Sequence, residues 1–255
     1  MSRTLDYYDQ NAERFAADTL DVKFTDIQDR FLGYLAPGAL ILDFGCGAGR
    51  DSRYFATKGF RVEACDGSEE MVRIAALNVG AVATSAVSTS EAENALQAET
   101  PDETSASDAT SEVGNRVQVR RMMFSELDEI ERYDGIFACA SILHVPYAEQ
   151  PDVFSRMRRA VKKGGVIYVS FKYGAFEGER NGRFFTDLDE ERLADVLRAS
   201  EEPYKSEAPD KSKAPGKDEN PGSTPELIII EKWVSGDARP GRGDEKWLNV
   251  ILRRT

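Results

Sequence analysis

The sequence contains little histidine and cysteine and no long apolar run. Its one histidine, His144, cannot by itself build a histidine-rich metal site. The three cysteines, Cys46, Cys65 and Cys139, are odd in number and lie in or beside apolar runs, which indicates reduced thiols rather than a disulfide framework. No apolar run approaches the roughly 20 residues that cross a bilayer. We therefore expect a cytoplasmic protein with no membrane segment and no bound metal.

Basic charge is scarce as well. Lysine and arginine number 33 against 45 aspartates and glutamates, so the formal net charge is −12. The pattern shows no broad basic face, which disfavours long nucleic acid as a partner. We expect a small-molecule substrate and a monomer or homodimer. Arg239 and Arg242 form a local basic pair, so contact with a tRNA end stays open as an alternative.

Two segments lack the apolar pattern of packed structure. Residues 81–112 contain no aromatic residue, lysine or arginine but seven acidic residues, a composition that predicts a disordered acidic insertion. Residues 200–222 carry prolines at regular intervals among lysines and glutamates, which predicts an extended, flexible insertion. Strong patterns resume after each segment, so we expect both to interrupt a single domain that spans residues 1–255.

Elsewhere, strand and helix patterns alternate. Strands are predicted at 39–44, 61–66, 116–122, 133–141 and 166–172, and helices at 52–59, 68–78, 151–162 and 186–199. Ser68 and Thr186 are the expected N-caps of two of these helices. Residues 1–36 are expected to form a helical lid.

The C-terminal part breaks the alternation. Residues 226–235 and 245–254 both read as strands, and the short connection between them requires an antiparallel pair. The predicted fold is therefore an α/β, Rossmann-like, doubly wound domain. It has three layers (αβα) and a mainly parallel seven-stranded sheet that ends in an antiparallel C-terminal hairpin.

A glycine-rich turn, ILDFGCGAGRDS, follows the first predicted strand. Gly45, Gly47 and Gly49 lie where open parallel sheets bind ligands, and glycine there permits a tight turn and close approach of a ligand. A dinucleotide motif would need its third glycine at position 50, which is Arg50. The Gly-Lys-Ser/Thr ending of a P-loop is missing as well.

Two aspartates narrow the ligand class. Asp43 lies two residues before the glycines, where it would repel a pyrophosphate and suit a cationic ligand. Asp66 ends the second strand, a position that typically accepts hydrogen bonds from ribose hydroxyls. A cationic, ribose-bearing, phosphate-free cofactor fits S-adenosyl-L-methionine. The alternatives are a buried or capping role for Asp43 and a turn role for Asp66.

Four segments together resemble class I S-adenosylmethionine-dependent methyltransferases. They read LDFGCGAGRDS, VEACDGSEEM, YDGIFACASILHV and VKKGGVIYVSFK, and the resemblance covers about residues 10–80 and 116–199 plus the terminal strands. The segments GRDS and FKYGAFEGERNGRFFTD are most similar to small bacterial members often labelled tellurite-resistance-like. Many members have an acid after the third strand that contacts the adenine amino group, whereas this sequence reads RRMMFSELD.

The resemblance implies a cofactor site at the ends of the first four strands. Its residues are Asp43, Gly45, Cys46, Gly47 and Gly49 at the methionine end, Asp66 at the ribose, Gly67, Ser68, Met123 and Phe124 near the adenine, and Ala140 and Ser141 under the methionine. Core packing is the alternative role for Met123 and Phe124.

Further candidates follow the fourth and fifth strands. His144 is a candidate general base with a pKa near neutrality or a hydrogen-bonded spacer, and Tyr173 is a second catalytic candidate. The candidate substrate contacts are Lys172, Arg180 and Arg183, which would hold an anion, and Tyr7 and Tyr8, which resemble a lid. Solvated surface charge is the alternative for the three basic residues, and a capping helix is the alternative for the tyrosines.

The sequence therefore predicts in-line transfer of a methyl group to a small acceptor, for example an anion, a thiol or a chalcogen oxyanion. A proton acceptor is needed only where the nucleophile arrives protonated. Three alternatives stay open: a non-catalytic S-adenosylmethionine-binding sensor, an inactive homologue, and a tRNA or protein methyltransferase. Arg50 and Asp43 disfavour a nicotinamide enzyme.

Overall fold

The structure, a computed structural model, describes residues 2–80, 83–84, 113–201, 226–239 and 241–255. Its main sheet consists of β1 (Leu40–Phe44), β2 (Arg61–Asp66), β3 (Ala83–Thr84), β4 (Val117–Arg121), β5 (Tyr133–Ala138), β6 (Val161–Lys172), β9 (Leu227–Gly236) and β10 (Lys246–Arg254). A separate hairpin consists of β7 (Glu177–Arg180) and β8 (Arg183–Thr186). The α-helices are α1 (Ser2–Thr19), α2 (Thr25–Leu32), α3 (Arg50–Thr57), α4 (Glu69–Val79), α6 (Gln150–Ala160) and α7 (Glu190–Ser200).

The main sheet has the strand order β3-β4-β2-β1-β5-β6-β10-β9. The strands from β3 to β6 are parallel, and β10 pairs antiparallel with both β6 and β9. The predicted fold class is therefore confirmed, and β3 adds a two-residue strand within the segment 81–112. The rest of that segment, and residues 202–222 of the second insertion, lie outside the described residues.

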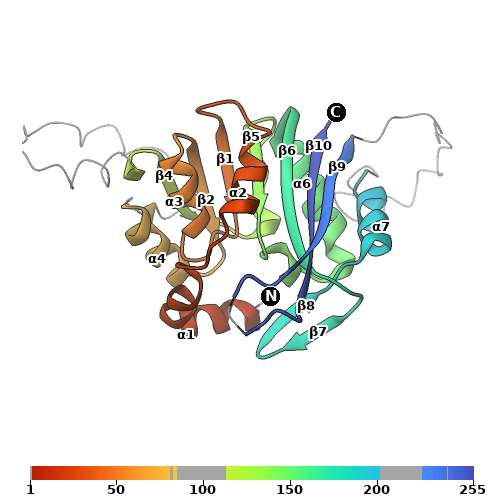
Figure 1. The fold of residues 1–255 in the computed structure, drawn as a ribbon, viewed down its shortest axis with the longest axis horizontal. Helices are drawn as coiled ribbons and strands as arrows, with labels where there is room; N and C mark the ends of the chain where they lie inside the picture. Colours follow the sequence, from red (N-terminus) through yellow and green to blue (C-terminus); the bar gives the residue numbers. More distant parts are fainter. Residues whose placement is uncertain (1, 81–82, 85–112, 202–225, 240) are drawn as a thin grey trace, which may run out of the picture.

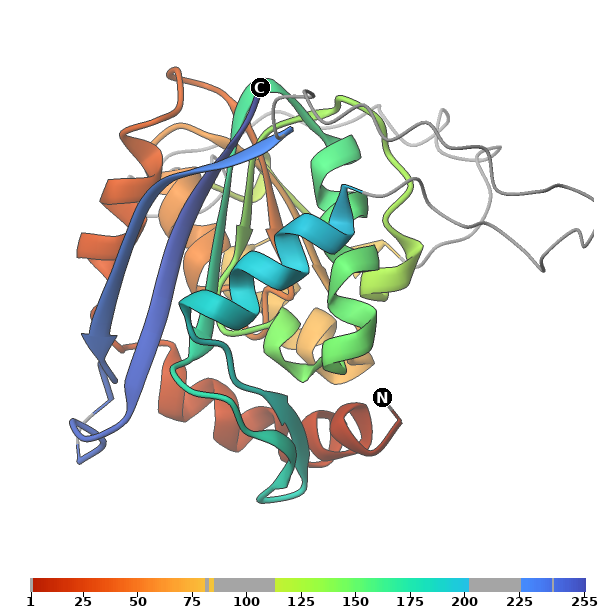
Figure 2. The ribbon, with the colours of Figure 1, turned by 90° about the vertical axis from the view of Figure 1, so that its right-hand side faces the viewer.

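Helices cover both faces of the sheet, which gives three layers (Figure 1, Figure 2). Phe31 of α2 and Phe55 of α3 pack with α4 against one face, where Phe137 of β5 is fully buried. Phe154 and Leu193, of α6 and α7, pack against the other face. None of the helices in the described ranges has the length and apolarity to cross a membrane.

The direction of chain winding reverses between β1 and β5. After β1 the chain adds β2 on one side, and after β4 it returns to add β5 on the other side of β1. In doubly wound sheets this reversal opens a crevice at the carboxyl ends of the two strands. The glycine turn after β1 lies at this crevice, and α1 runs across the same end of the sheet (Figure 1).

Two helix starts test the predicted caps. Ser68 caps α4, because its hydroxyl accepts a hydrogen bond from the Met71 backbone N–H, as predicted. The prediction for Thr186 is wrong: α7 is capped by Asp189, whose side chain accepts from the Arg192 backbone N–H. Thr186 instead ends β8 and donates its hydroxyl to the Val145 carbonyl. The hairpin β7–β8 was not predicted, because its strands are short and its sequence is mostly polar.

Candidate cofactor and acceptor site

A cavity of about 630 Å³ lies beyond the carboxyl ends of the strands, within the range of small-molecule sites. One end, which we call the glycine-loop end, is lined by residues at or just after the carboxyl ends of β1, β2 and β4, including Gly45, Asp66 and Phe124. The other, the tryptophan end, is lined by residues of β6, β9 and β10, including Trp233 and Trp247. Both ends open into one continuous space.

Close packing makes glycine necessary at the first position of the loop. Gly45 has a φ of 85°, and a Cβ there would lie 2.3 Å from the Cβ of Ser141. The Gly45 and Cys46 backbone N–H groups both donate to the Cys65 carbonyl, which fixes the turn against β2. Gly45, Cys46 and Gly47 line the cavity. Gly49 does not: it caps α3 in a left-handed conformation.

Asp66 lies at the centre of the glycine-loop end. One carboxylate oxygen accepts from the Gly47 backbone N–H, and the other accepts from the Ser68 backbone N–H, each at 2.9 Å. Burial raises the pKa of Asp66, and these backbone donors partly offset the effect. Each oxygen keeps a further lone pair, so the carboxylate can accept hydrogen bonds from a diol. Ser68 itself does not line the cavity.

Asp43 does not face the cavity, and the expectation of a direct contact with the cofactor is wrong. Its side chain is 2% exposed, and Ser52 donates to it from α3 at 2.5 Å. Burial, together with the neighbouring Asp51 carboxylate, raises the pKa of Asp43 well above its usual range. The carboxyl therefore braces the start of α3 under the glycine loop rather than attracting a cation.

The expected adenine region is assembled from three elements. Met123 and Phe124 line the cavity after β4, and the Phe124 ring packs edge-on against Phe44 at 4.8 Å. Leu5 of α1 and Met71 of α4 also line it, and neither was predicted. The apolar stripe of α1 could have indicated Leu5, whereas no sequence pattern distinguishes Met71 from the other apolar residues of α4.

Ala140 and Ser141, which end the fourth predicted strand, line the cavity. Ala140 adopts a φ of 50°, and its backbone N–H donates to the Ser170 hydroxyl at 2.8 Å. Ser141 donates to the Phe44 carbonyl at 2.6 Å. These two bonds hold the loop after β5 between β1 and β6.

His144 is held by hydrogen bonds on both ring nitrogens. Nδ1 lies 2.6 Å from the Phe184 carbonyl, which can only accept, so Nδ1 carries the proton. Nε2 then accepts from the hydroxyl of Tyr8 at 2.8 Å, and Arg183 donates to the same hydroxyl at 3.2 Å. Burial, reinforced by the Arg183 charge, lowers the pKa of His144 to about 4. The expectation of a pKa near neutrality is therefore wrong.

Of the predicted substrate contacts, Lys172, Arg183 and Tyr8 line the cavity, as His144 does. The remaining candidates lie outside it: Tyr173, Arg180 and Tyr7. Tyr173 donates its hydroxyl to Glu190, and Arg180 binds both carboxylate oxygens of Asp187 at 3.0 and 2.8 Å. Tyr7 packs edge-on against Tyr8. These residues stabilise the β7–β8 hairpin and α1 rather than the cavity wall.

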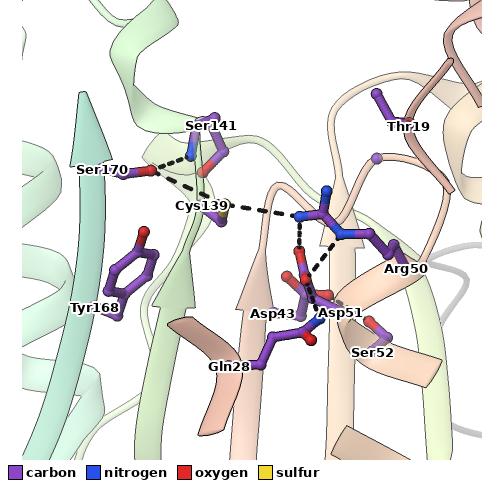
Figure 3. A network of polar contacts seen from close by, with 12 residues as sticks. Thr19, Gln28, Asp43, Arg50, Asp51, Ser52, Cys139, Ser141, Tyr168 and Ser170 are labelled. Atoms are coloured by element: carbon purple, nitrogen blue, oxygen red, sulfur yellow. Dashed lines mark hydrogen bonds and ion pairs between the residues drawn. The ribbon is translucent and has the colours of Figure 1, made fainter. Parts of the chain in front are cut away.

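Sequence reasoning missed Arg50, which lines the cavity next to the glycine loop. Its guanidinium binds Asp51 through two hydrogen bonds, and Gln28 holds the same carboxylate (Figure 3). The Phe24 ring lies 4.5 Å from the guanidinium carbon. Cys139 lies 3.9 Å from Nη2 of Arg50. The contacts fix a guanidinium in the wall between the two ends of the cavity.

Trp233 and Trp247 belong to the two C-terminal strands that the sequence predicts, and both line the tryptophan end. No residue pattern signals this role, because it depends on the face of the sheet that the helices leave uncovered. In the described part of the chain, no group of three or more histidine, cysteine, aspartate or glutamate side chains could hold a metal ion.

Comparisons with known proteins identify the family of the chain. A family model described as a methyltransferase domain matches residues 11–192 of the chain. The chain therefore belongs to this methyltransferase family, a class that uses S-adenosyl-L-methionine as cofactor. None of the curated proteins matches the sequence significantly.

Solved structures share the fold over most of their length. A 1,6-didemethyltoxoflavin-N1-methyltransferase from Burkholderia thailandensis is 18% identical in sequence and has a TM-score of 0.65. The match covers 100% of this chain and 88% of the Burkholderia chain. The magnesium protoporphyrin IX methyltransferase of Synechocystis is 16% identical and has a TM-score of 0.61. That match covers 100% of this chain and 96% of the Synechocystis chain. A TehB-like SAM-dependent methyltransferase from Corynebacterium glutamicum is 14% identical with a TM-score of 0.53, covering 100% of both chains.

Proposed function

We propose that this chain transfers the methyl group of S-adenosyl-L-methionine to a small, anionic acceptor. The observation that carries the proposal is the continuous cavity. It joins a glycine loop and Asp66, suited to a nucleoside, to a second end rich in aromatic and basic side chains.

The residues of the glycine-loop end fit the cofactor. Asp66 offers free lone pairs to the ribose, the loop has no side chain at Gly45 or Gly47, and Met123 and Phe124 offer apolar surface to the adenine. When bound, S-adenosylmethionine supplies a methyl group already activated on a sulfonium. The protein must then align the acceptor and exclude water.

The lid helix suits this task. Tyr8 and Phe15 of α1 line the cavity and pack edge-on against each other with ring centroids 5.1 Å apart. The hydroxyl of Tyr8 is held from both sides by His144 and Arg183. These contacts support a roof that keeps water away from the reacting atoms.

The charge of the cavity supports an anionic acceptor. Seven basic and four acidic side chains line it, although the whole chain has a formal net charge of −12. The basic residues are Lys23, Arg30, Arg50, Lys172, Arg183, Arg239 and Arg242, and the acidic residues are Asp26, Asp51, Asp66 and Asp237. Because the pKa of His144 lies near 4, the site offers a poor proton acceptor at neutral pH. An acceptor that arrives deprotonated needs none.

The test combines calorimetry with a turnover assay. S-adenosylhomocysteine should bind the full chain, and incubation with S-adenosylmethionine and a panel of carboxylates, phenols, thiols and oxyanions should release S-adenosylhomocysteine. Binding without release with any acceptor would favour the non-catalytic sensor, and absence of binding would overturn the proposal. The variant Asp66→Ala is the matched loss-of-site control.

A further inference from the structure

The cavity wall at the tryptophan end is one face of three adjacent strands. The register pairs Asn249 of β10 with Ser170 of β6 and with Trp233 of β9. Two residues further along, it pairs Trp247 with Lys172 and Ser235. Directly paired residues project from the same face of a sheet, as do residues two apart on one strand. All six side chains line the cavity, and we call this set the tryptophan patch.

The patch begins where helix α2 ceases to cover the sheet. Next to it on β6, the buried ring of Tyr168 stacks on Phe137, which in turn packs against Phe31 of α2. The Tyr168 hydroxyl donates to Asn249 Oδ1 at 2.8 Å, at the border between the covered core and the patch. The open face is therefore continuous with the core rather than a loose surface loop.

The hydrogen-bonding groups at the base of the patch are engaged by the protein. The amide nitrogen of Asn249 donates to the Ser235 hydroxyl at 3.0 Å, and the Ser170 hydroxyl accepts from the Ala140 backbone. What the patch offers a ligand is therefore mainly the surface of its indole rings. Rings of this kind favour a flat, aromatic partner that stacks on them.

Cations frame these rings. The Lys172 ammonium lies 5.1 Å from the centre of the Trp247 ring, and the Arg30 guanidinium lies 4.4 Å from that of Trp233. Arg50 approaches the patch through Cys139, whose sulfur lies 3.9 Å from Arg50 Nη2 and 4.0 Å from the Ser170 hydroxyl (Figure 3). Lys172 and Arg30 are paired with the carboxylates of Glu245 and Glu231, so Arg50 is the group of this frame that we expect to bind a ligand's negative charge.

Arg50 keeps a hydrogen-bond donor for a ligand. Nε and Nη2 of Arg50 bind Asp51, whereas Nη1 has no hydrogen-bond acceptor among the residues that the structure describes. The two bonds to Asp51 and the Phe24 ring fix the orientation of the guanidinium, so little side-chain entropy is lost when Nη1 binds an anion.

We infer that the tryptophan patch, together with Arg50, binds a planar aromatic anion, such as an aromatic carboxylate or a phenolate. The inference rests on the proposed function, in which this molecule is the methyl acceptor. The aromatic plane lies against the indoles, and the negative group is bound by Nη1 of Arg50.

The chain contains two tryptophans, and both belong to the patch. Intrinsic tryptophan fluorescence therefore reports directly on its occupancy. We would titrate the full chain, with and without S-adenosylhomocysteine, with 4-hydroxybenzoate as the probe. Two matched probes separate the two requirements: 4-hydroxybenzamide keeps the ring without the carboxylate, and cyclohexanecarboxylate keeps the carboxylate without the aromatic plane.

We expect a saturable change with 4-hydroxybenzoate and at least tenfold weaker binding of both matched probes. Arg50→Gln should weaken 4-hydroxybenzoate binding at least tenfold, whereas Arg198→Gln, which removes an exposed arginine of α7, should not. Trp247→Leu should weaken 4-hydroxybenzoate binding to a similar extent, and the fluorescence of Trp233 still reports binding in that variant. It replaces Arg50→Gln as the test if Arg50→Gln unfolds. Denaturation curves establish that each variant is folded.

Three results would overturn the inference: no saturable change, equal affinity for the three probes, or equal binding by the Arg50→Gln and Arg198→Gln variants. Each would leave the proposed function standing if S-adenosylhomocysteine still bound. Conversely, failure of S-adenosylhomocysteine to bind would overturn the proposed function, and the titration without it would still decide the inference.

Discussion

The hydroxyl of Tyr8 donates a hydrogen bond of 2.8 Å to Nε2 of His144, and this bond joins α1 to the turn after β5. The opposite ring nitrogen of His144 donates to the Phe184 carbonyl in β8. One imidazole therefore connects α1, the end of the central sheet and the β7–β8 hairpin. The roof of the cavity depends on a buried polar contact as well as on apolar packing.

Replacing Tyr8 by phenylalanine should loosen this roof. The ring is kept, but Nε2 of His144 is left buried without a donor, which costs about 1–3 kcal/mol of unfolding free energy. Urea denaturation measures the loss, and hydrogen exchange should show faster opening of α1. In a double-mutant cycle with His144→Gln, the two losses should be less than additive. Strict additivity would show that the two side chains are not coupled.

The low pKa of His144 predicts a loss of stability in acid. The folded protein keeps the ring neutral down to about pH 4, whereas the unfolded chain binds a proton below about pH 6.5. The free energy of unfolding is therefore unaffected by this group above about pH 6.5, and it falls by about 2–3 kcal/mol as the pH drops towards 4. Urea midpoints of the wild type and His144→Gln at several pH values measure it, because the carboxyl groups common to both proteins cancel in the difference. Parallel curves for the two proteins would refute the shift.

The space next to Gly45 should distinguish it from a glycine with the same backbone conformation. Gly45 and Gly59 have φ values of 85° and 89°, but a Cβ would meet Ser141 at Gly45 and nothing within 4 Å at Gly59. Gly59→Ala should lower the free energy of unfolding by about 1–2 kcal/mol through backbone strain alone. Gly45→Ala should cost about 1–3 kcal/mol more, and affinity for S-adenosylhomocysteine should fall at least tenfold. Equal effects in denaturation and calorimetry would contradict the close approach.

The two strand-ending aspartates should differ in cofactor binding. Asp66→Asn places an amide NH₂ against a backbone N–H donor in the cavity wall, so calorimetry should show at least tenfold weaker binding of S-adenosylhomocysteine. Asp43→Asn keeps a carbonyl oxygen that accepts from Ser52 outside the cavity, so the affinity should change less than about threefold. A larger loss of affinity in Asp43→Asn than in Asp66→Asn would support the direct role in cofactor binding that the sequence suggested for Asp43.

Local residue patterns were sufficient for much of the fold. The alternation of strands and helices, the antiparallel C-terminal pair and the Ser68 cap depend on neighbouring residues, and the structure confirms them. The sequence also indicated the glycine turn, and Asp66 does line the cavity. The prediction that Asp43 faces the cavity was wrong because the orientation of its side chain depends on the hydrogen bond from Ser52. Only the folded α3 brings Ser52 next to Asp43.

The tryptophan end of the cavity was decided by tertiary structure. Its six-residue patch combines β6 with β9 and β10, and only the register between these strands places Ser170, Asn249 and Trp233 in one row. Likewise, Arg180 and Tyr173 lie outside the cavity because, in the folded chain, Arg180 binds Asp187 and Tyr173 binds Glu190. Helix and strand signals arise from residues close together in the sequence, whereas a binding surface requires side chains that only long-range packing brings together.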